Sequence, residues 1–188
     1  MEIQLRQAKL ADGPAVAPLI VDAIGDIANR ITGEDSPQLI IQKLIELFER
    51  QDNRISYLNT FIAQYNGEVA GMMIVYGGDE AIQLDAQLER WLSAKNAPIQ
   101  TIELEARPDE YYIDTVCVDA NFRGKGIGTS LLKHAEVLCK QKGYNKLSLS
   151  VELEKDRARH LYEKMGFVYS EPWMIIGEEF DHMVKPIK

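Results

Sequence analysis

The sequence predicts an α/β (α+β) protein in which helices flank a mixed β-sheet. Segments with alternating apolar residues recur along the chain, and segments with apolar residues at helical spacing separate them. Glycine, proline and asparagine mark most of the boundaries between these segments. Strands joined partly by a tight turn and partly by helices pack most naturally as one sheet with helices against it.

Length and composition indicate one globular domain. With 188 residues, 46% of them hydrophobic and 27% charged, the chain can bury a core and has an ordinary composition. We predict a single domain over residues 1–188 with a helical insertion at about 80–100. No apolar run approaches the roughly 20 residues of a membrane span, and the start of the chain lacks the pattern of a signal peptide. We therefore expect a cytoplasmic protein with no membrane partner.

Charge and cysteine usage exclude several classes of partner. The formal net charge is −8, whereas a protein that binds nucleic acid usually presents a basic face, so we expect no nucleic acid. Cys117 and Cys139 lie far apart in the chain, and His134, His160 and His182 lack metal-ligand spacing. We therefore expect neither a disulfide framework nor a metal site.

The N-terminal half is predicted to hold a strand, two helices and a hairpin. The alternation at 3–8 predicts the strand, one apolar face predicts a helix over about 12–29, and Pro37 opens a second helix. Asn66-Gly67 lies between two apolar runs, which predicts a hairpin with strands over 60–65 and 68–76. Residues of about 80–97 have helical spacing and form the predicted insertion.

The C-terminal half alternates between strands and helices and ends in an antiparallel pair. Gly143 and Gly166 are natural helix ends, and Gly177 is a natural turn. The expected strands cover 111–118 and 147–151, the helices 126–142 and 156–165, and the final pair 167–176 and 178–186.

A glycine-rich turn between the strand at 111–118 and the next helix is the most informative stretch. Glycines at 124, 126 and 128 let the backbone turn tightly and approach a ligand. The first amides of a helix lack intrahelical partners and, with the helix dipole, form an anion site. Arg123 and Lys125 add positive charge in an acidic chain. These are the groups that a pyrophosphate requires.

Two nucleotide-binding patterns fit this turn poorly. The Gly-x-x-x-x-Gly-Lys-Ser/Thr loop is absent. The dinucleotide fingerprint would need glycine where Thr129 stands and an acidic residue about 20 positions further on, where the sequence is Leu-Ser-Leu-Ser. A tight turn without a ligand remains the alternative.

Two motifs resemble the GNAT superfamily of acetyl-CoA-dependent N-acetyltransferases. The first, Arg-x-x-Gly-x-Gly at 123–128, is similar to the loop with which that family grips the pyrophosphate of coenzyme A. The second, at 158–167, is similar to the family segment Ala-x-x-Leu-Tyr-Glu-Lys-x-Gly-Phe. The chain departs from the family pattern at Ala120, which is often proline, and at Lys155, which is often a coenzyme-binding asparagine.

The resemblance implies the GNAT-type acyl-CoA N-acyltransferase fold, with a mixed, mostly antiparallel central sheet. It implies acetyl-CoA as co-substrate, its pyrophosphate on the glycine loop and its pantetheine arm along the backbone of the preceding strand. It also implies that this strand and the next one splay apart. The expected coenzyme-binding residues are Val116, Cys117, Val118, Arg123, Gly124, Lys125, Gly126, Ile127, Gly128, Thr129, Lys155 and Tyr162.

The resemblance further implies direct transfer of the acetyl group to an amine. Tyr162 occupies the family position of the general acid that protonates the leaving thiolate, although it could also be a core aromatic. An amide near Val116 would polarise the thioester carbonyl. Because the family uses no acyl-enzyme, Cys117 is expected to be a packed strand residue.

A general base is needed because alkylamines are mostly protonated at neutral pH. Asp114 is our first choice, since a carboxylate in an apolar strand is costly unless it is paired or useful. Strand alternation places it on the opposite face from Ile113 and Thr115. A structural hydrogen bond is an equal alternative, Glu103 and Glu105 are rivals, and a water chain would also serve.

The acceptor is expected to be a small-molecule or peptide amine. The segments expected to bind it are residues of about 20–60 and residues of about 80–110. The acidic residues that could attract a cationic amine are Asp22, Asp26, Glu34 and Asp35, which could equally form a solvated helix face. The aromatic residues that could line its pocket are Trp91, Tyr111 and Tyr112. The resemblance makes a homodimer possible, but no feature of the sequence fixes the oligomeric state. Two other functions remain: a module that senses acyl-CoA without turnover, and a nucleotide-binding α/β protein.

Overall fold

The computed structural model describes residues 2–188, so Met1 of the predicted domain lies outside the described residues. The described chain forms one sheet of seven strands in the order β1-β2-β3-β4-β5-β7-β6, in which only β4 and β5 pair in parallel. The predicted mixed, mostly antiparallel sheet is therefore confirmed. The strands are β1 (Ile3–Gln7), β2 (Thr60–Tyr65), β3 (Glu68–Gly77), β4 (Tyr111–Val118), β5 (Lys146–Glu152), β6 (Val168–Ile175) and β7 (Glu178–Pro186).

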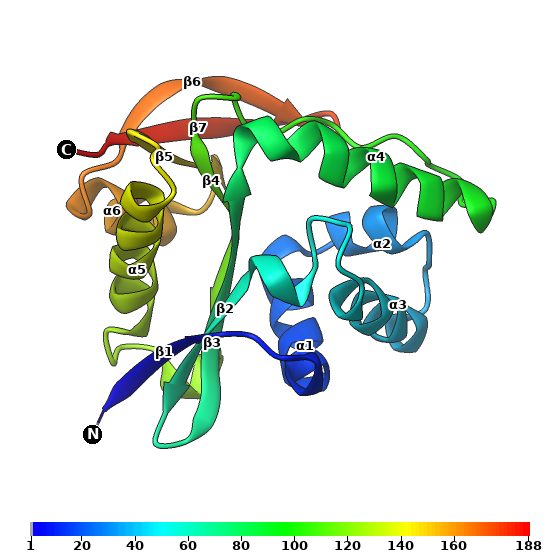
Figure 1. Ribbon diagram of the computed structural model, residues 1–188, viewed down its shortest axis with the longest axis horizontal. Coiled ribbons are helices and arrows are strands. Elements are labelled where there is room, and N and C mark those ends of the chain that lie inside the picture. Colours follow the sequence, from blue (N-terminus) through cyan, green and yellow to red (C-terminus); the bar gives the residue numbers. More distant parts are fainter. Residues whose placement is uncertain (1) are drawn as a thin grey trace.

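Helices cover both faces of the sheet (Figure 1). On one face lie α1 to α4, and on the other lie α5 and α6. No helix within residues 2–188 combines the length and apolar character needed to cross a membrane. The helices are α1 (Gly13–Ile24), α2 (Ile27–Thr32), α3 (Pro37–Glu49), α4 (Gly78–Ala94), α5 (Ile127–Gln141) and α6 (Asp156–Lys164).

The single helix predicted over 12–29 was wrong, because the chain breaks at Gly25. Gly25 has φ 53° and ψ −127°, a conformation that is strained for other residues, and it separates α1 from α2. The apolar spacing continues from Ile24 to Ile27 across the break, so periodicity alone did not reveal it. The break turns α2 toward α3 and α4 (Figure 1).

The predicted hairpin and the helix predicted at about 80–97 are both present. Asn66 and Gly67 have φ values of 53° and 88°, as the tight hairpin turn requires. The helix, α4, begins at Gly78, directly after β3 and slightly before the predicted start. A Cβ atom on Gly78 would lie 2.0 Å from the Arg107 carbonyl oxygen, so only glycine fits where the helix leaves the sheet.

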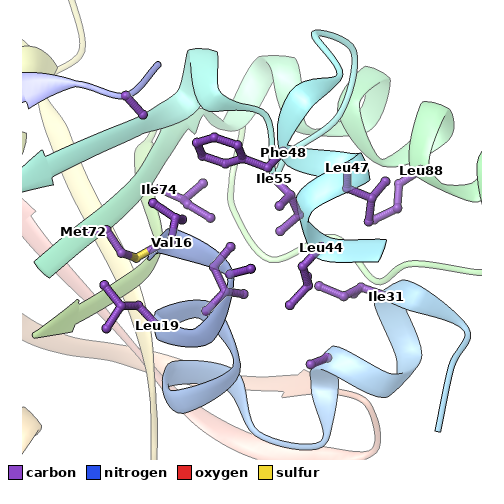
Figure 2. Packing of buried hydrophobic residues seen from close by; sticks show 14 of the residues in the cluster. Val16, Leu19, Ile31, Leu44, Leu47, Phe48, Ile55, Met72, Ile74 and Leu88 are labelled. Carbon is purple, nitrogen blue, oxygen red and sulfur yellow. The ribbon is translucent and has the colours of Figure 1, made fainter. Parts of the chain in front are cut away.

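The larger core lies between the sheet and helices α1 to α4. Figure 2 shows Val16 of α1 and Phe48 of α3 close to Met72 and Ile74 of β3, with Leu44 of α3 further along the same core. All five side chains are essentially inaccessible to solvent. Burial of each side chain of this size contributes about 1.5–3 kcal/mol. The core therefore holds the helices firmly against the strands that carry the site described next.

Candidate functional site

Strands β4 and β5 part in the middle of the sheet. Their parallel pairing runs from Tyr111 with Leu147 to Ile113 with Leu149 and then ends. Beyond that point, the rest of β4 and of β5 line a cavity of about 810 Å³. The splayed strands that the resemblance implied are thus present, and the gap between them opens into the cavity.

The glycine-rich turn lies at one end of this cavity. Gly124 and Gly126 have φ values of 79° and 80°, and no described atom lies within 4 Å of where a Cβ would stand on either. Helix α5 starts at Ile127, and the first helical hydrogen bond joins the Ser130 amide to the Gly126 carbonyl at 3.0 Å. The amides of 127–129 therefore precede the ladder and are available to an anion.

The cavity gathers nearly all the predicted coenzyme-binding residues. Lys125 differs, since its ammonium lies 5.5 Å from the centre of the Tyr65 ring and the residue does not belong to the cavity wall. The predicted residues that line the cavity are Val116, Cys117, Val118, Arg123, Gly124, Gly126, Ile127, Gly128, Thr129, Lys155 and Tyr162.

Tyr162 and Cys117 line the cavity from α6 and β4. Burial raises the pKa of Tyr162 to about 12, with a smaller effect from nearby Cys117, so the phenol stays protonated across the physiological range. The Tyr162 ring packs edge-on against Phe167, with centroids 6.1 Å apart. Burial also raises the pKa of Cys117 to about 11, which leaves a neutral thiol packed in the larger core.

Asp114 lies in a β-bulge, and this corrects the predicted strand alternation. Ile113 pairs with Val75 of β3 and Thr115 with the adjacent Ile74, so Asp114 is the extra residue in β4. Asp114 does face away from Ile113, but it shares a face with Thr115, whose hydroxyl donates to its Oδ1 at 2.8 Å. The bulge turns the carboxylate toward Arg54.

Arg54, which the sequence analysis missed, is the centre of a buried ionic cluster. Its guanidinium contacts Glu105 at 2.8 Å, Asp85 at 3.5 Å and, through Nε at 2.7 Å, Asp114. The Tyr76 hydroxyl donates to Asp114 at 2.6 Å. Arg54 itself is 4% exposed. The sequence pointed to Arg54 only indirectly, because the Asp114 carboxylate in an apolar strand requires a partner.

Two acids of the cluster, Asp85 and Glu105, have a pKa that burial raises, and of the two Glu105 is the one that lines the cavity. Burial raises the pKa of Glu105 to about 7, although Arg54 opposes that rise. Its Oε2 also accepts a hydrogen bond from the Tyr112 hydroxyl at 2.9 Å, and the residue lines the cavity. Glu103 lies outside this cavity, where it accepts from the Ile176 amide.

The residues proposed for an acceptor pocket do not gather at one place. Asp22 lines the cavity, but Glu34 pairs with Lys95 at 2.8 Å. Asp26 and Asp35 are exposed and belong to no part of the cavity wall. Among the aromatic candidates, Tyr112 lines the cavity, whereas Trp91 and Tyr111 belong to the two cores.

The fold and the cavity together define a class of protein, and sequence comparison identifies it. A splayed parallel strand pair beside a glycine turn that opens a helix is suited to a long anionic ligand with an extended arm. The model of the acetyltransferase (GNAT) family matches residues 22–167. The chain therefore belongs to the GNAT family.

Solved structures agree with this assignment along the whole chain. A crystal structure described as an acetyltransferase is 30% identical, with a TM-score of 0.82, over 98% of this chain and all of that one. An N-acetyltransferase from Staphylococcus aureus Mu50, 24% identical over 96% of this chain and 99% of that one, has a TM-score of 0.78 and so shares the fold.

Curated relatives match over shorter segments. An uncharacterised N-acetyltransferase of Bacillus subtilis is 34% identical over 79 residues, which are 41% of this chain and 51% of that protein. A B. subtilis protein named as a candidate ribosomal protein bS18-alanine N-acetyltransferase is 34% identical over 58 residues, which are 31% of this chain and 38% of that protein. The chain thus spans about half the length of these relatives or less.

Proposed function

We propose that the protein is an N-acetyltransferase that moves the acetyl group of acetyl-CoA directly to an amine. One observation carries this proposal. A single cavity extends from the available amides at the start of α5, through the gap between β4 and β5, to Tyr162 and the acids around Arg54. A phosphate site, an extended channel, a proton donor and a proton acceptor are the parts that the reaction requires.

The residues present fit coenzyme A. The amides of 127–129 and the exposed Arg123 would hold its pyrophosphate, and the glycines leave room for it. The backbone of Val116 to Val118 has no β5 partner, so it is free to pair with the pantetheine arm. Lys155 would meet a phosphate only after releasing its bonds to the Ala23 carbonyl at 3.1 Å and to Glu152 at 2.9 Å.

The acid step is assigned to Tyr162. Its high pKa keeps the phenol protonated until a strong base appears beside it, and the thiolate that leaves the thioester is that base. A backbone amide near Val116, on the unpaired part of β4, would polarise the thioester carbonyl.

The base step is assigned to Glu105 rather than to our first choice, Asp114. Asp114 already accepts hydrogen bonds from Arg54, Tyr76 and Thr115, which leaves it little capacity to take a further proton. Glu105 lines the same cavity, and a pKa of about 7 is suited to proton transfer at neutral pH. In this proposal Asp114 positions Arg54.

The acceptor is proposed to be an amine that enters beside this cluster. Glu105 and Asp114 line the wall together with Arg54, and Asp85 also pairs with that arginine, so the acids outnumber the cation, which favours a cationic amine. Ile27, Ile31 and Phe180 make the rest of that end apolar. The name of the B. subtilis relative points to a peptide amine, and the cavity also admits a small molecule.

The first experiment is calorimetric titration of the full chain with acetyl-CoA, with ATP and NAD as controls. We expect binding of acetyl-CoA alone, followed by thiol release when small amines or peptide N-termini are added. Preferred binding of ATP or NAD would overturn the proposal. Tight acetyl-CoA binding without turnover on any amine would favour the sensing module.

A further inference from the structure

A second, much smaller cavity adjoins the main one beside the acids. Its volume is about 20 Å³, and it shares Ile27, Ile31 and Ile175 with the wall of the main cavity. It also shares Arg54 and Glu105, so these apolar side chains surround the same small space as the proposed base. We call the region formed by these five shared residues the acceptor end.

The two arginines in the wall of the smaller cavity are both paired with acids. The Arg54 guanidinium is held by the three acids described above, and Arg30 lies 3.6 Å from Glu103. Each buried side-chain nitrogen and oxygen of residues 2–188 already has a hydrogen-bond partner. A carboxylate or phosphate on the acceptor would therefore find acids at this place and no unpaired cation, and the burial of such a charge is costly.

The rest of the wall at the acceptor end is apolar. Ile31 and Ile175 are 6% and 4% exposed, and Ile27 and Ile102 pack against the same core as Ile31. Contact with an uncharged apolar group removes nonpolar surface from water, whereas a second charge placed there would lose its hydration. This wall therefore favours an acceptor with one amine and an apolar body.

Ile176, which completes the wall of the smaller cavity, has an unusual backbone conformation. Its φ is 51°, and with Gly177, at φ 78°, it forms the two-residue turn between β6 and β7. The chain makes the turn between β2 and β3 with Asn66 and Gly67, at the similar φ values of 53° and 88°. Asparagine tolerates this left-handed region, whereas a β-branched residue is strained in it. An isoleucine kept at a strained position points to a role for its side chain.

Hydrogen bonds hold the β6–β7 hairpin against the segment that carries Glu105. The Ile176 amide donates to the Glu103 carboxylate, and Trp173 Nε1 donates to the Leu104 carbonyl oxygen at 2.9 Å. Both acceptors directly precede Glu105 in the chain. The apolar end of the hairpin and the proposed base are thus held next to each other.

We propose that the acceptor is a primary monoamine carried on an uncharged apolar body, with Ile176 as a specificity-determining residue. This inference rests on the proposed function, in which Glu105 takes the amine proton. The amine lies at Glu105, and its alkyl or aryl body lies between α2 and the end of the β6–β7 hairpin. Diamines fit poorly because their second charge would face isoleucine, and amino acids fit poorly because their carboxylate would face Glu105.

The first test compares amines that differ by one charged group. Norleucine is pentylamine with a carboxylate beside the amine, and cadaverine is pentylamine with a second amine at the far end. We expect kcat/KM for pentylamine, measured by thiol release, to exceed the values for both by at least about tenfold. A kcat/KM for norleucine, cadaverine or a peptide N-terminus that equals or exceeds the value for pentylamine would overturn the inference.

The second test replaces the strained residue. Ile176→Asn removes the apolar side chain but suits the turn, so we expect stability in denaturant unfolding to be unchanged or higher. We expect kcat/KM for pentylamine to fall about tenfold through KM, with acetyl-CoA affinity unchanged. Met174→Asn is the control and should behave as the wild type, because Met174 lies on the same hairpin but is 55% exposed. Equal kcat/KM values for the two variants would overturn the role of Ile176.

A binding measurement separates this inference from the proposed function. NMR of isoleucine methyl groups follows the full chain, with coenzyme A present, while pentylamine, cadaverine or norleucine is added. We expect pentylamine alone to shift the methyl signals of Ile31, Ile175 and Ile176, because only its body contacts them. Unchanged signals with pentylamine would overturn the inference. Selective shifts without any transfer from acetyl-CoA would count against the proposed function alone.

Discussion

Glu105 and Asp114 share one arginine but differ in their other contacts. Asp114 accepts bonds from Arg54, Tyr76 and Thr115, whereas Glu105 accepts from Arg54 and Tyr112 and faces the cavity. In the proposed mechanism the two acids therefore take different roles, Asp114 holding the arginine and Glu105 exchanging a proton. The difference is set by one or two hydrogen bonds at each carboxylate.

Glu105→Gln is predicted to abolish the acidic limb of the pH–rate profile. In the wild type, the pKa of about 7 means that Glu105 is protonated and inactive as a base below that pH, so kcat/KM falls as pH falls. The variant is expected to lose roughly 10²-fold in kcat/KM at pH 7.5 and to show no such limb. Glu103→Gln, on the same segment but outside the cavity, is the control. A limb that persists near pH 7 in Glu105→Gln would assign the base elsewhere.

Tyr162→Phe is predicted to lower kcat roughly 10²-fold while leaving acetyl-CoA affinity within about twofold. In the proposed mechanism the phenol contributes a proton to the leaving thiolate, whereas the ring that packs against Phe167 is still present in the variant. Thiol-release kinetics and calorimetry measure the two quantities separately. Normal turnover would remove Tyr162 from the mechanism.

At the scale of elements, two irregular places make the site. The end of pairing between β4 and β5 creates the gap, and the bulge at Asp114 turns a carboxylate out of strand alternation toward Arg54. The glycine turn then sets the start of α5 at the end of the cavity. Regular strands and a regular helix would have left no room for a ligand.

Gly126→Asp is predicted to weaken acetyl-CoA binding at least tenfold, because it places negative charge beside the amides that would hold pyrophosphate. The matched control is Gly143→Asp, after the other end of α5. Gly143 has almost the same φ, 83° against 80°, and no described atom lies within 4 Å of a Cβ at either position. Calorimetry decides, since equal affinities of the two variants would contradict the loop assignment.

At the scale of the whole molecule, Arg54 joins parts of the chain that are distant in sequence. Its three partners come from α4, from the segment after it and from β4. Arg54, Glu105 and Asp114 line the cavity, and the pair with Asp85 links them to α4. The same cation thus joins these distant segments and opposes the rise that burial causes in the pKa of Glu105.

Arg54→Met is predicted to destabilise the fold by about 3–5 kcal/mol, because it leaves buried carboxylates without a counter-charge. Arg50→Met is the control, since its pair with Asp52 is 40% exposed on both sides and contributes under about 1 kcal/mol. Denaturant unfolding measures both free energies. A loss below about 1 kcal/mol for Arg54→Met would show that the cluster is not structural.

Much of the fold was predictable because it depends on local rules. Asn66-Gly67, Gly143 and Gly177 act through their own backbone preferences, and apolar periodicity follows from which face each segment buries. The glycine turn before α5 was predictable for the same reason, since strand, glycines and helix are contiguous in sequence. The break at Gly25 was missed because the apolar spacing runs across it.

Residues close together in the chain were enough to predict the alternation of strands and helices, the family motifs and the glycine turn before α5. Packing between distant segments decides which acids share Arg54, how the bulge orients Asp114, and that Ser150 and Glu110 both meet His182. Those contacts join residues up to about 70 positions apart. Proton affinity depends on burial and on neighbouring charge, and both are set by packing between such distant segments.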